Sequence, residues 1–328
     1  MPSSMTHTYF GNDVYKGLSN NCQNKIQNNL EYFKLFAQGS DPFMFYHFLI
    51  GKRANEISGV QRMMHRSKTR EFFLEIVNYI YDNKLINNSE VMAYLYGYIC
   101  HYYLDLYTHP FIYYKGGIFK RGNKNTYKYN GLHQKIEYGI DLYFIKKNED
   151  VEVRKFKVYK AIFDVKGLTP ELKDIIKATI GKVYSISNVG DIYEESIWYM
   201  KKFFRYFNYD PYGVKLKLYK LVDGITPNSV IRVQELSFSN EYSDINNYLN
   251  LDKKIWYCPW DKTKRYRSSF LELYERAKIK AIKTIEEVTR MLENDSLDKG
   301  KLNKLFENLS FCTGIDCDKE VEIKYFEF

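Results

Sequence analysis

Histidine and acidic side chains recur four residues apart at two places in this sequence. The first place is His101 and Asp105, which His109 extends by another four residues, and the second is His133 and Glu137. On an α-helix, residues four apart lie about 40° apart around the axis and project from the same side. Imidazole and carboxylate groups are ligands that zinc accepts. The spacing therefore predicts two facing helices that bind metal ions between them.

An isolated histidine and carboxylate four residues apart on a helix more often form a surface ion pair than a metal site. Two features favour a metal site here. The chain has only six histidines, and three of them fall in the two pairs and the extension at His109. His101 and Asp105 also stand among apolar neighbours such as Ile99 and Leu104. An unpaired charge would be costly there, and a bound cation would offset that cost.

Asp41, His65 and His47 carry less information on their own. Asp41 lies in Gly39-Ser-Asp-Pro42, which is typical of a tight turn, and an aspartate before a proline commonly caps such a turn. His65 comes just before a predicted helix and has a plain structural interpretation as a residue at the helix start. His47 is interpreted as a partly buried histidine with a satisfied hydrogen bond.

Apolar residues recur at helical spacing along most of the chain. The predicted helical segments are 24–37, 67–84, 88–109, 130–147, 153–164, 169–185, 190–208 and 264–293. The helix over 88–109 should end at His109, because a proline at 110 disfavours helical geometry in the residue before it. Strand-like alternation is rare and clearest over 320–326. We therefore predict an all-α fold, a multi-helix bundle with a metal cluster between its helices.

Two changes in composition suggest how the chain is organised. Residues 111–130 are rich in glycine and basic residues, as is common in a functional loop. Glycine, proline and asparagine interrupt the periodicity again over 223–260. We predict a metal-binding helical hydrolase core over 1–222, with a C-terminal extension over 223–328 that packs on it and consists of one long helix and a short tail.

Composition narrows the class of protein. The net charge of +9 makes phosphate-bearing partners plausible, although the lysines are spread along the whole chain, as solubilising residues usually are. The five cysteines include no CxxC pair, which fits reduced thiols. The first residues show no signal-peptide pattern, and no apolar run is long enough to cross a bilayer. The sequence predicts a soluble cytoplasmic protein without a transmembrane segment.

The order of the metal-binding residue types resembles that of the zinc-dependent bacterial phospholipase C family, which is related in fold to the fungal single-strand nucleases. The order is Asp, His, His-x3-Asp, His and His-x3-Glu, and the resemblance covers roughly residues 5–145. Four segments are also similar to the intracellular branch of that family: Thr6–Gly11, Gly39–Phe43, Met64–Arg66 and Thr108–Pro110.

The resemblance implies a zinc cluster and assigns its ligands. One zinc ion would be bound by Asp41, His65, His101 and Asp105, and a second by His109, His133 and Glu137. Asp105 would reach a third metal ion together with His7. In the secreted members of the family, an N-terminal tryptophan completes this third site. The present sequence lacks that tryptophan, so the third site is left open.

The activity that the resemblance implies is hydrolysis of a phosphodiester by metal-activated water, with Asp41 as the base. A phospholipid substrate would need an apolar rim and peripheral membrane contact, and the aromatic segments 43–48 and 111–114 are candidates for that rim. A single-strand nuclease or small-molecule phosphodiesterase would instead use the basic loop over 115–128. The third alternative is a non-catalytic metal-binding module, in which protein ligands saturate every metal.

Overall fold

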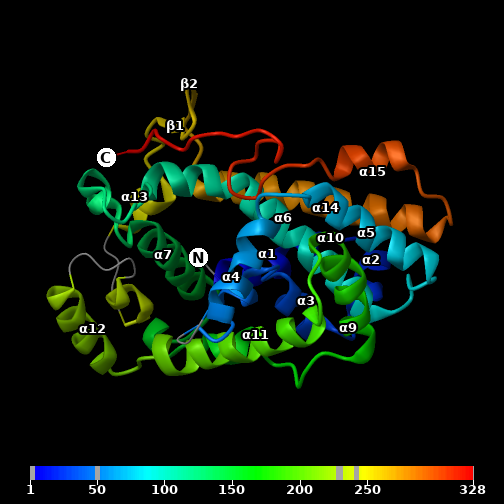
Figure 1. Ribbon diagram of the computed structural model, residues 1–328, viewed down its shortest axis with the longest axis horizontal. Helices are drawn as coiled ribbons and strands as arrows, with labels where there is room; N and C mark the ends of the chain where they lie inside the picture. The colour runs from blue at the N-terminus through cyan, green and yellow to red at the C-terminus, as the bar shows by residue number, and fades with distance from the viewer. Residues whose placement is uncertain (1–3, 49–51, 227–231, 240–243, 328) are drawn as a thin grey trace.

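The computed structural model describes residues 4–48, 52–226, 232–239 and 244–327. These residues are mainly helical, which confirms the predicted all-α fold (Figure 1). Their one sheet is an antiparallel pair, β1 (Trp256–Cys258) and β2 (Asp261–Tyr266). The α-helices are α1 (Ser4–Gly17), α2 (Asn20–Ile26), α3 (Leu30–Phe36), α4 (Lys52–Met64), α5 (Thr69–Asp82), α6 (Ser89–Gly116), α7 (Leu132–Asn148), α8 (Val158–Ala161), α9 (Pro170–Ile176), α10 (Lys182–Tyr184), α11 (Val189–Phe203), α12 (Val214–Ile225), α13 (Ile245–Leu249), α14 (Phe270–Glu293) and α15 (Lys299–Leu305). Short 3-10 and π segments are η1 (Asp41–Phe45), η2 (Lys124–Tyr129), η3 (Val153–Lys155), η4 (Lys177–Gly181), η5 (Phe204–Asn208) and η6 (Val233–Leu236).

Helix α6 is the centre of the fold. It begins at an N-cap, where the side chain of Asn88 accepts hydrogen bonds from two backbone N–H groups of the first turn. Its side chains are buried on all sides through most of its length, because α14, α3, α7 and α1 all pack against it. Buried tyrosine hydroxyls on α6 find partners on these neighbours, as Tyr96 does with Thr289 of α14 at 2.6 Å. This helix can therefore hold polar ligands in a fixed position inside the molecule.

The predicted end of this helix at His109 is wrong, because α6 continues through Pro110 to Gly116. A proline inside a helix removes one backbone hydrogen bond and costs about 3 kcal/mol. The turns beyond the proline bury Phe111 and Ile112, and the ring of Phe111 packs edge-on against Trp256 at 5.5 Å. Burial of these large side chains offsets the cost of the proline.

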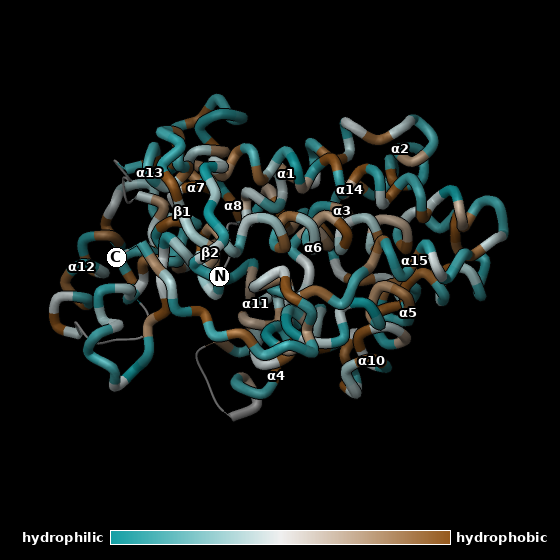
Figure 2. Tube along the Cα trace, turned by 90° about the horizontal axis from the view of Figure 1, so that it is seen from above, coloured by the Kyte–Doolittle hydropathy of each residue, from teal (hydrophilic) through white to brown (hydrophobic). Residues whose placement is uncertain are grey.

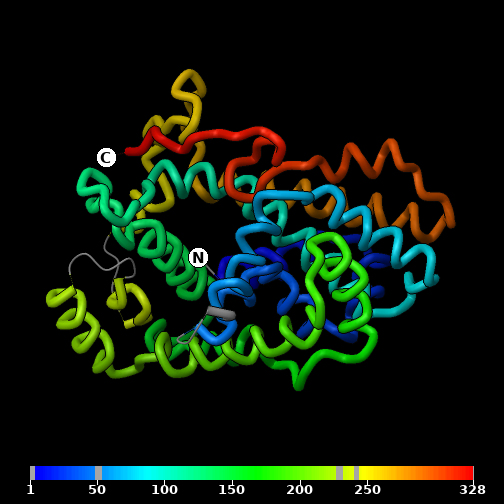
Figure 3. The backbone as a smooth tube through the Cα atoms, viewed as in Figure 1, coloured from blue at the N-terminus to red at the C-terminus, as the bar shows by residue number. Residues whose placement is uncertain are grey.

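Other differences from the prediction are spread along the chain. Helices α1, α4, α12, α13 and α15 were not predicted, and the segment over 24–37 is divided into α2 and α3. Residues 320–326 form no strand. This C-terminal segment runs back across the molecule to the hairpin of β1 and β2 (Figure 3), where the N–H groups of Lys324 and Tyr325 donate to the carbonyl of Pro259. The alternating sequence therefore lies beside the hairpin without adding a strand to its sheet.

The predicted boundary between 222 and 223 falls within α12, and the division into core and extension stays a prediction. The long C-terminal helix is present as α14, which begins with a capping box of Ser269 and Glu272 and packs along α6 and α1. None of the helices in the described ranges is long and apolar enough to cross a membrane. The cytoplasmic location stays a prediction as well.

Candidate metal centre

The eight side chains singled out in the sequence come together in one region of the structure. They lie on α1, on η1, in the turn that follows α4, on α6 and on α7. Within the described part of the chain they form three groups, in each of which one ligand atom per residue lies within 4.8 Å of the others. The groups are His7/His101/Asp105, Asp41/His65/His101 and His109/His133/Glu137.

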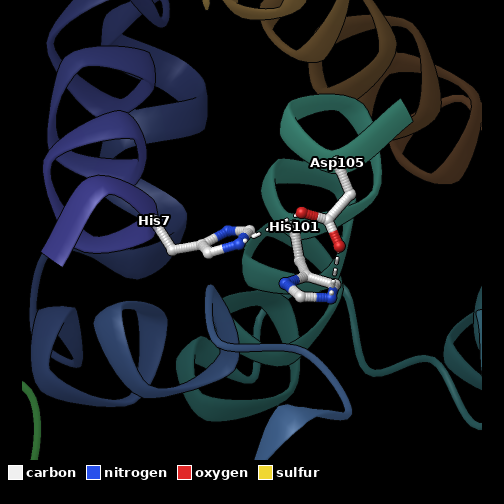
Figure 4. Close-up of side chains that lie close together, drawn as sticks. All are labelled: His7, His101 and Asp105. Carbon is white, nitrogen blue, oxygen red and sulfur yellow. Dashed lines mark ion pairs between the residues drawn. The ribbon is translucent and has the colours of Figure 1, made fainter. Parts of the chain in front are cut away.

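Asp105 is the centre of this region, because four imidazole rings face its carboxylate. Nε2 of His7 lies 3.2 Å from Oδ1. Nitrogens of His65, His101 and His109 lie 3.1, 3.4 and 3.7 Å from Oδ2. His7 reaches the carboxylate from α1, whereas His101 and Asp105 project from one side of α6 (Figure 4). Burial alone would raise the pKa of Asp105, but the surrounding imidazoles hold it well below its usual value, so the carboxylate is charged.

Asp41 approaches the same cluster from η1. Its Oδ1 lies 3.7 Å from Nε2 of His65 and accepts a hydrogen bond of 3.2 Å from the side-chain amide of Gln61. Its Oδ2 is buried and has no hydrogen-bond partner among the described residues. Burial raises the pKa of Asp41 to about 6, although His65 opposes the shift. A buried carboxylate oxygen without a partner is costly, and a bound cation would supply the missing interaction.

The ring orientations of His65 and His101 are set by backbone carbonyls. Nδ1 of His65 donates to the carbonyl of Gln61 at 2.9 Å, and Nδ1 of His101 lies 3.3 Å from the carbonyl of Ala37. Because a carbonyl only accepts, the proton sits on Nδ1, and each Nε2 turns its lone pair into the cluster. The two Nε2 atoms lie 3.3 Å apart. Two lone pairs facing each other at this distance fit a cation between them.

The third group is more open to solvent than the other two. Nε2 of His133 lies 3.0 Å from Oε1 of Glu137, and Nε2 of His109 lies 3.8 Å from the same oxygen. The side chains of His109 and His133 are 14% and 23% exposed, whereas that of His101 is fully buried. Burial alone would raise the pKa of Glu137, but nearby positive charge, that of His133 and His109 included, holds it below its usual value. This group therefore offers a metal ion one charged ligand and two neutral ones at a position that solvent can reach.

The C-terminal segment contributes contacts that sequence reasoning missed. The carbonyl of Phe311 accepts a hydrogen bond from Nδ1 of His109 at 2.9 Å. The backbone N–H of Phe311 donates to the carbonyl of His65 at 2.9 Å. The Phe311 ring packs against the rings of His65 and His101, with centroids 4.9 and 5.8 Å apart. Nothing in the local sequence marks Phe311, because its partners are more than 200 residues away. Gln61 was also missed, although its position four residues before His65 is a usable signal.

Two glycines allow the backbone to approach the ligands. Gly39 has a φ of +54°, and a Cβ there would lie 2.2 Å from Cδ2 of His101. Gly116 lies at the end of α6, where a Cβ would be 2.8 Å from Cα of His133. Both positions therefore exclude larger residues.

His47 belongs to none of these three groups. Its ring nitrogens lie 2.9 Å from Oε1 of Glu195 and 3.0 Å from the hydroxyl of Tyr199. The side chain is 38% exposed. This arrangement matches the interpretation of His47 as a histidine with satisfied hydrogen bonds.

The comparisons with known proteins point the same way as the donor set. Residues 6–188 match the model of the family described as zinc-dependent phospholipase C. The chain belongs to this family. All eight candidate ligands lie within the matched residues, whereas Phe311 lies outside them. No significant match was found among the curated proteins or among the solved structures.

The residues of this member of the zinc-dependent phospholipase C family fit the metal that its family name implies. Zinc accepts imidazole nitrogen and carboxylate oxygen, and the three groups offer only these donors. A bound cation would supply the partner that Oδ2 of Asp41 lacks. It would also separate the facing lone pairs on the Nε2 atoms of His65 and His101. The histidine tautomers fixed by backbone carbonyls are those that present Nε2 for binding.

Proposed function

We propose that this protein is a zinc-dependent phosphodiester hydrolase of the phospholipase C type, with a phospholipid or a smaller phosphoester as substrate. The observation that carries the proposal is the partly exposed group of His109, His133 and Glu137 beside two fully buried groups. Catalytic zinc sites keep a position open for water or substrate, whereas structural sites are closed by protein ligands. Solvent access at His133 favours the catalytic type over a purely structural one.

The proposed ligand sets are those that the family resemblance implies, and each overlaps one of the three groups. Asp41, His65, His101 and Asp105 would hold one zinc ion; His109, His133 and Glu137 would hold a second; His7 and Asp105 would hold a third. Bound zinc supplies a nucleophilic water at neutral pH and neutralises charge on the phosphoryl oxygens.

Asp41 is the proposed base. The carboxylate, whose Oδ1 accepts a hydrogen bond from Gln61, would accept a proton from the attacking water. Gln61 acts as a positioning residue, because its amide holds the carboxylate in one orientation.

The aromatic segments considered as a rim for a lipid substrate are buried only in part. Tyr113 is partly exposed, and its ring centroid lies 5.9 Å from that of His109 and 5.1 Å from that of His133. Phe43, Phe45 and Phe111 are buried in the core and do not line an entrance. The basic loop expected for a nucleic-acid substrate is partly present. Lys120 and Lys124 are exposed, but Lys115 is buried and bonded to Glu327 at 2.6 Å.

Three substrates separate the alternatives. Purified protein loaded with zinc is assayed with phosphatidylcholine, with single-stranded DNA and with a chromogenic phosphodiester. We expect turnover of phosphatidylcholine and of the chromogenic ester. Turnover of DNA alone would establish a nuclease, and metal binding without turnover of any of the three would establish a non-catalytic module.

Metal content tests the site itself. We expect His101→Ala and Glu137→Ala to lower the zinc content measured by elemental analysis, because each removes a ligand from a different group. Full parental metal content in both variants would overturn the ligand assignment. The His47→Ala variant provides the control, since His47 lies outside the three groups.

A further inference from the structure

The outer face of α12 is apolar and exposed. Its side chains Val214, Leu218, Leu221, Val222 and Ile225 are between 38% and 73% exposed. Their spacing of four, three, one and three residues places them on one side of a helix. Figure 2 shows α12 at one end of the molecule, with hydrophobic and hydrophilic stretches alternating along it. Single exposed apolar residues are ordinary, but a contiguous stripe marks an interaction surface.

The opposite side of α12 is attached to the protein, so the orientation of the helix is fixed. The hydroxyl of Tyr219 donates to the carbonyl of Phe207 at 3.1 Å. The buried carboxylate of Asp223 accepts hydrogen bonds from the N–H groups of Val233 and Gln234 at 2.9 and 3.0 Å. These contacts lie on the inner side of the helix, which leaves the apolar stripe facing outward.

The charges beside the stripe indicate what it binds. Lys217 and Lys220 are exposed on the same helix, and the whole chain carries a net charge of +9. An apolar stripe flanked by lysines is the pattern of a helix that lies in a membrane interface, with lysines near the lipid phosphates. A second copy of this chain fits less well, because a symmetric pair of such helices would bring lysines together. A stable dimer buries about 800 Å² per partner. A helix of 12 residues is only about 18 Å long, so its outer face alone is a small surface for such an interface.

A series of packing contacts links α12 to the partly exposed group of His109, His133 and Glu137. Segment η6, which accepts the inner side of α12, is preceded by Arg232. The Arg232 side chain packs against Gly131, where a Cβ would lie 2.6 Å from its Cγ. Gly131 caps α7, whose second residue is His133. In Figure 1, α12 lies beside the end of the molecule that contains α7.

We propose that the outer face of α12 docks on the surface of a phospholipid membrane, with Leu218 and Leu221 in the interface and Lys217 and Lys220 at the lipid phosphates. This inference deepens the proposed function and rests on it only for the choice of a phospholipid surface. Docking through α12 holds the protein on the membrane without any helix crossing it, and α7 with His133 is held at the same end of the molecule.

Vesicle binding by the whole 328-residue chain tests the proposal. The probes are vesicles of phosphatidylcholine mixed with phosphatidylglycerol, and vesicles of phosphatidylcholine alone, with binding measured by co-sedimentation. We expect stronger binding to the mixed vesicles, and weaker binding at high salt because salt screens the lysines. Leu218→Glu combined with Leu221→Glu should lower partitioning about tenfold or more, since each carboxylate must leave water.

Matched variants keep the result specific. Ile279→Glu on α14 changes a side chain that is 63% exposed and should bind vesicles as the parent does. Lys217→Glu combined with Lys220→Glu should weaken binding to the mixed vesicles while leaving the fold intact. Parent protein that binds neither vesicle, or leucine variants that bind like the parent, would overturn the proposal. A parental dimer that becomes monomeric in the leucine variants would overturn it too, by assigning the face to a second copy.

The proposed activity is measured separately in the same variants. Turnover of the chromogenic soluble phosphodiester should be unchanged by the leucine substitutions, because the stripe does not touch that substrate. If the parent turns over the soluble phosphodiester but does not bind vesicles, only the proposed docking surface is wrong. Vesicle binding without soluble turnover by the parent supports the docking surface and sinks only the proposed activity.

Discussion

The backbone carbonyl of Phe311 accepts a hydrogen bond from Nδ1 of His109 at 2.9 Å, across 202 residues of sequence. The same residue donates its N–H to the carbonyl of His65. Phe311 therefore holds the backbone of one proposed ligand, His65, and the ring of another, His109. Phe311 lies beyond the residues that match the family. The C-terminal segment is therefore part of the wall of the metal centre, because it fixes the orientation of rings supplied by the matched part of the chain.

Replacing Phe311 by leucine tests this relationship. The backbone hydrogen bonds remain available in Phe311→Leu, but the ring contacts with His65 and His101 are lost. Loss of a hydrogen-bonded partner behind a metal ligand typically costs about 10- to 100-fold in metal affinity. Because Phe311→Leu keeps the hydrogen bonds, we expect a measurable but smaller loss. The absorption spectrum of the cobalt-substituted protein should also change, because it reports the ligand geometry.

Phe306→Leu is the control for a general loss of packing. Phe306 is fully buried in the same region of the chain and stacks on Phe73 with centroids 4.6 Å apart, without touching a histidine of the cluster. Both substitutions should lower the melting temperature. Equal effects of the two on the cobalt spectrum and on metal affinity would contradict a positioning role for Phe311.

The pH at which metal is released should differ between the groups. Burial alone would lower the pKa of His7, but the charge of Asp105 raises it above its usual value. Burial holds the pKa of His101 well below its usual value. A metal binds only the neutral imidazole, so a proton displaces metal from His7 at a higher pH than from His101. As the pH falls, we expect the metal ion proposed for His7 and Asp105 to be lost before the one proposed for His101.

Equilibrium dialysis at a series of pH values, followed by elemental analysis, measures this order. The variant His7→Ala should lack the first step of metal loss and keep the later ones. If the parent and His7→Ala release metal in the same steps, His7 does not hold a metal ion.

His47 lies outside the metal centre and His133 lies in it, so their alanine variants should differ in zinc content. His47 and Glu195 are 38% and 43% exposed, and ion pairs at that exposure contribute about 0–1 kcal/mol to stability. His47→Ala should therefore keep the parental zinc content and nearly the parental melting temperature. His133→Ala should lose the metal of its group while the helices stay folded, as judged by circular dichroism. A loss of zinc in His47→Ala would place this residue in the metal centre after all.

The sequence sufficed for those parts of the site that a helix determines by itself. A spacing of four residues puts His101 and Asp105 on one side of α6, and His133 and Glu137 on one side of α7, whatever surrounds them. It could not show that Phe311 faces His109, because contacts over such a distance in the chain depend on the whole fold. The convergence of the groups from α1, η1 and the end of α4 was inferred from the order of residue types and not from periodicity.

Helix α1 escaped prediction for a physical reason. Its sequence has little apolar periodicity, and polar residues such as Thr6 and Thr8 are buried in it. Its start is stabilised from outside, because Asp141 of α7 accepts hydrogen bonds from the N–H groups of Met5 and Thr6 at 3.2 and 2.7 Å. The end of α6 escaped prediction because burial of the turns beyond Pro110 outweighs a local rule. In both cases tertiary contacts decide the helix.

Asp141 leads to a prediction about stability and pH. Its carboxylate is fully buried and also accepts a hydrogen bond from the hydroxyl of Thr6 at 2.8 Å. Burial raises the pKa of Asp141 to about 7, although the hydrogen bonds from Thr6 oppose the shift. The folded protein thus holds a proton that the unfolded chain releases at lower pH. The stabilisation is complete below the ordinary aspartate pKa and is lost as the pH rises through about 7.

Asp141→Asn should remove this dependence, because asparagine stays neutral and keeps an oxygen that accepts from the N–H of Thr6. Melting temperatures measured from mildly acidic to mildly alkaline pH should fall for the parent and change less for the variant. Asp141→Ala should be less stable than both at every pH, since two N–H groups at the start of α1 lose their partner. A parental melting temperature that rises through this pH range, and more steeply than that of Asp141→Asn, would mean that Asp141 is held as a charged carboxylate by the N-terminus of α1. His7 follows directly after Thr6, so the Asp141→Ala variant should also lose metal at the His7 group.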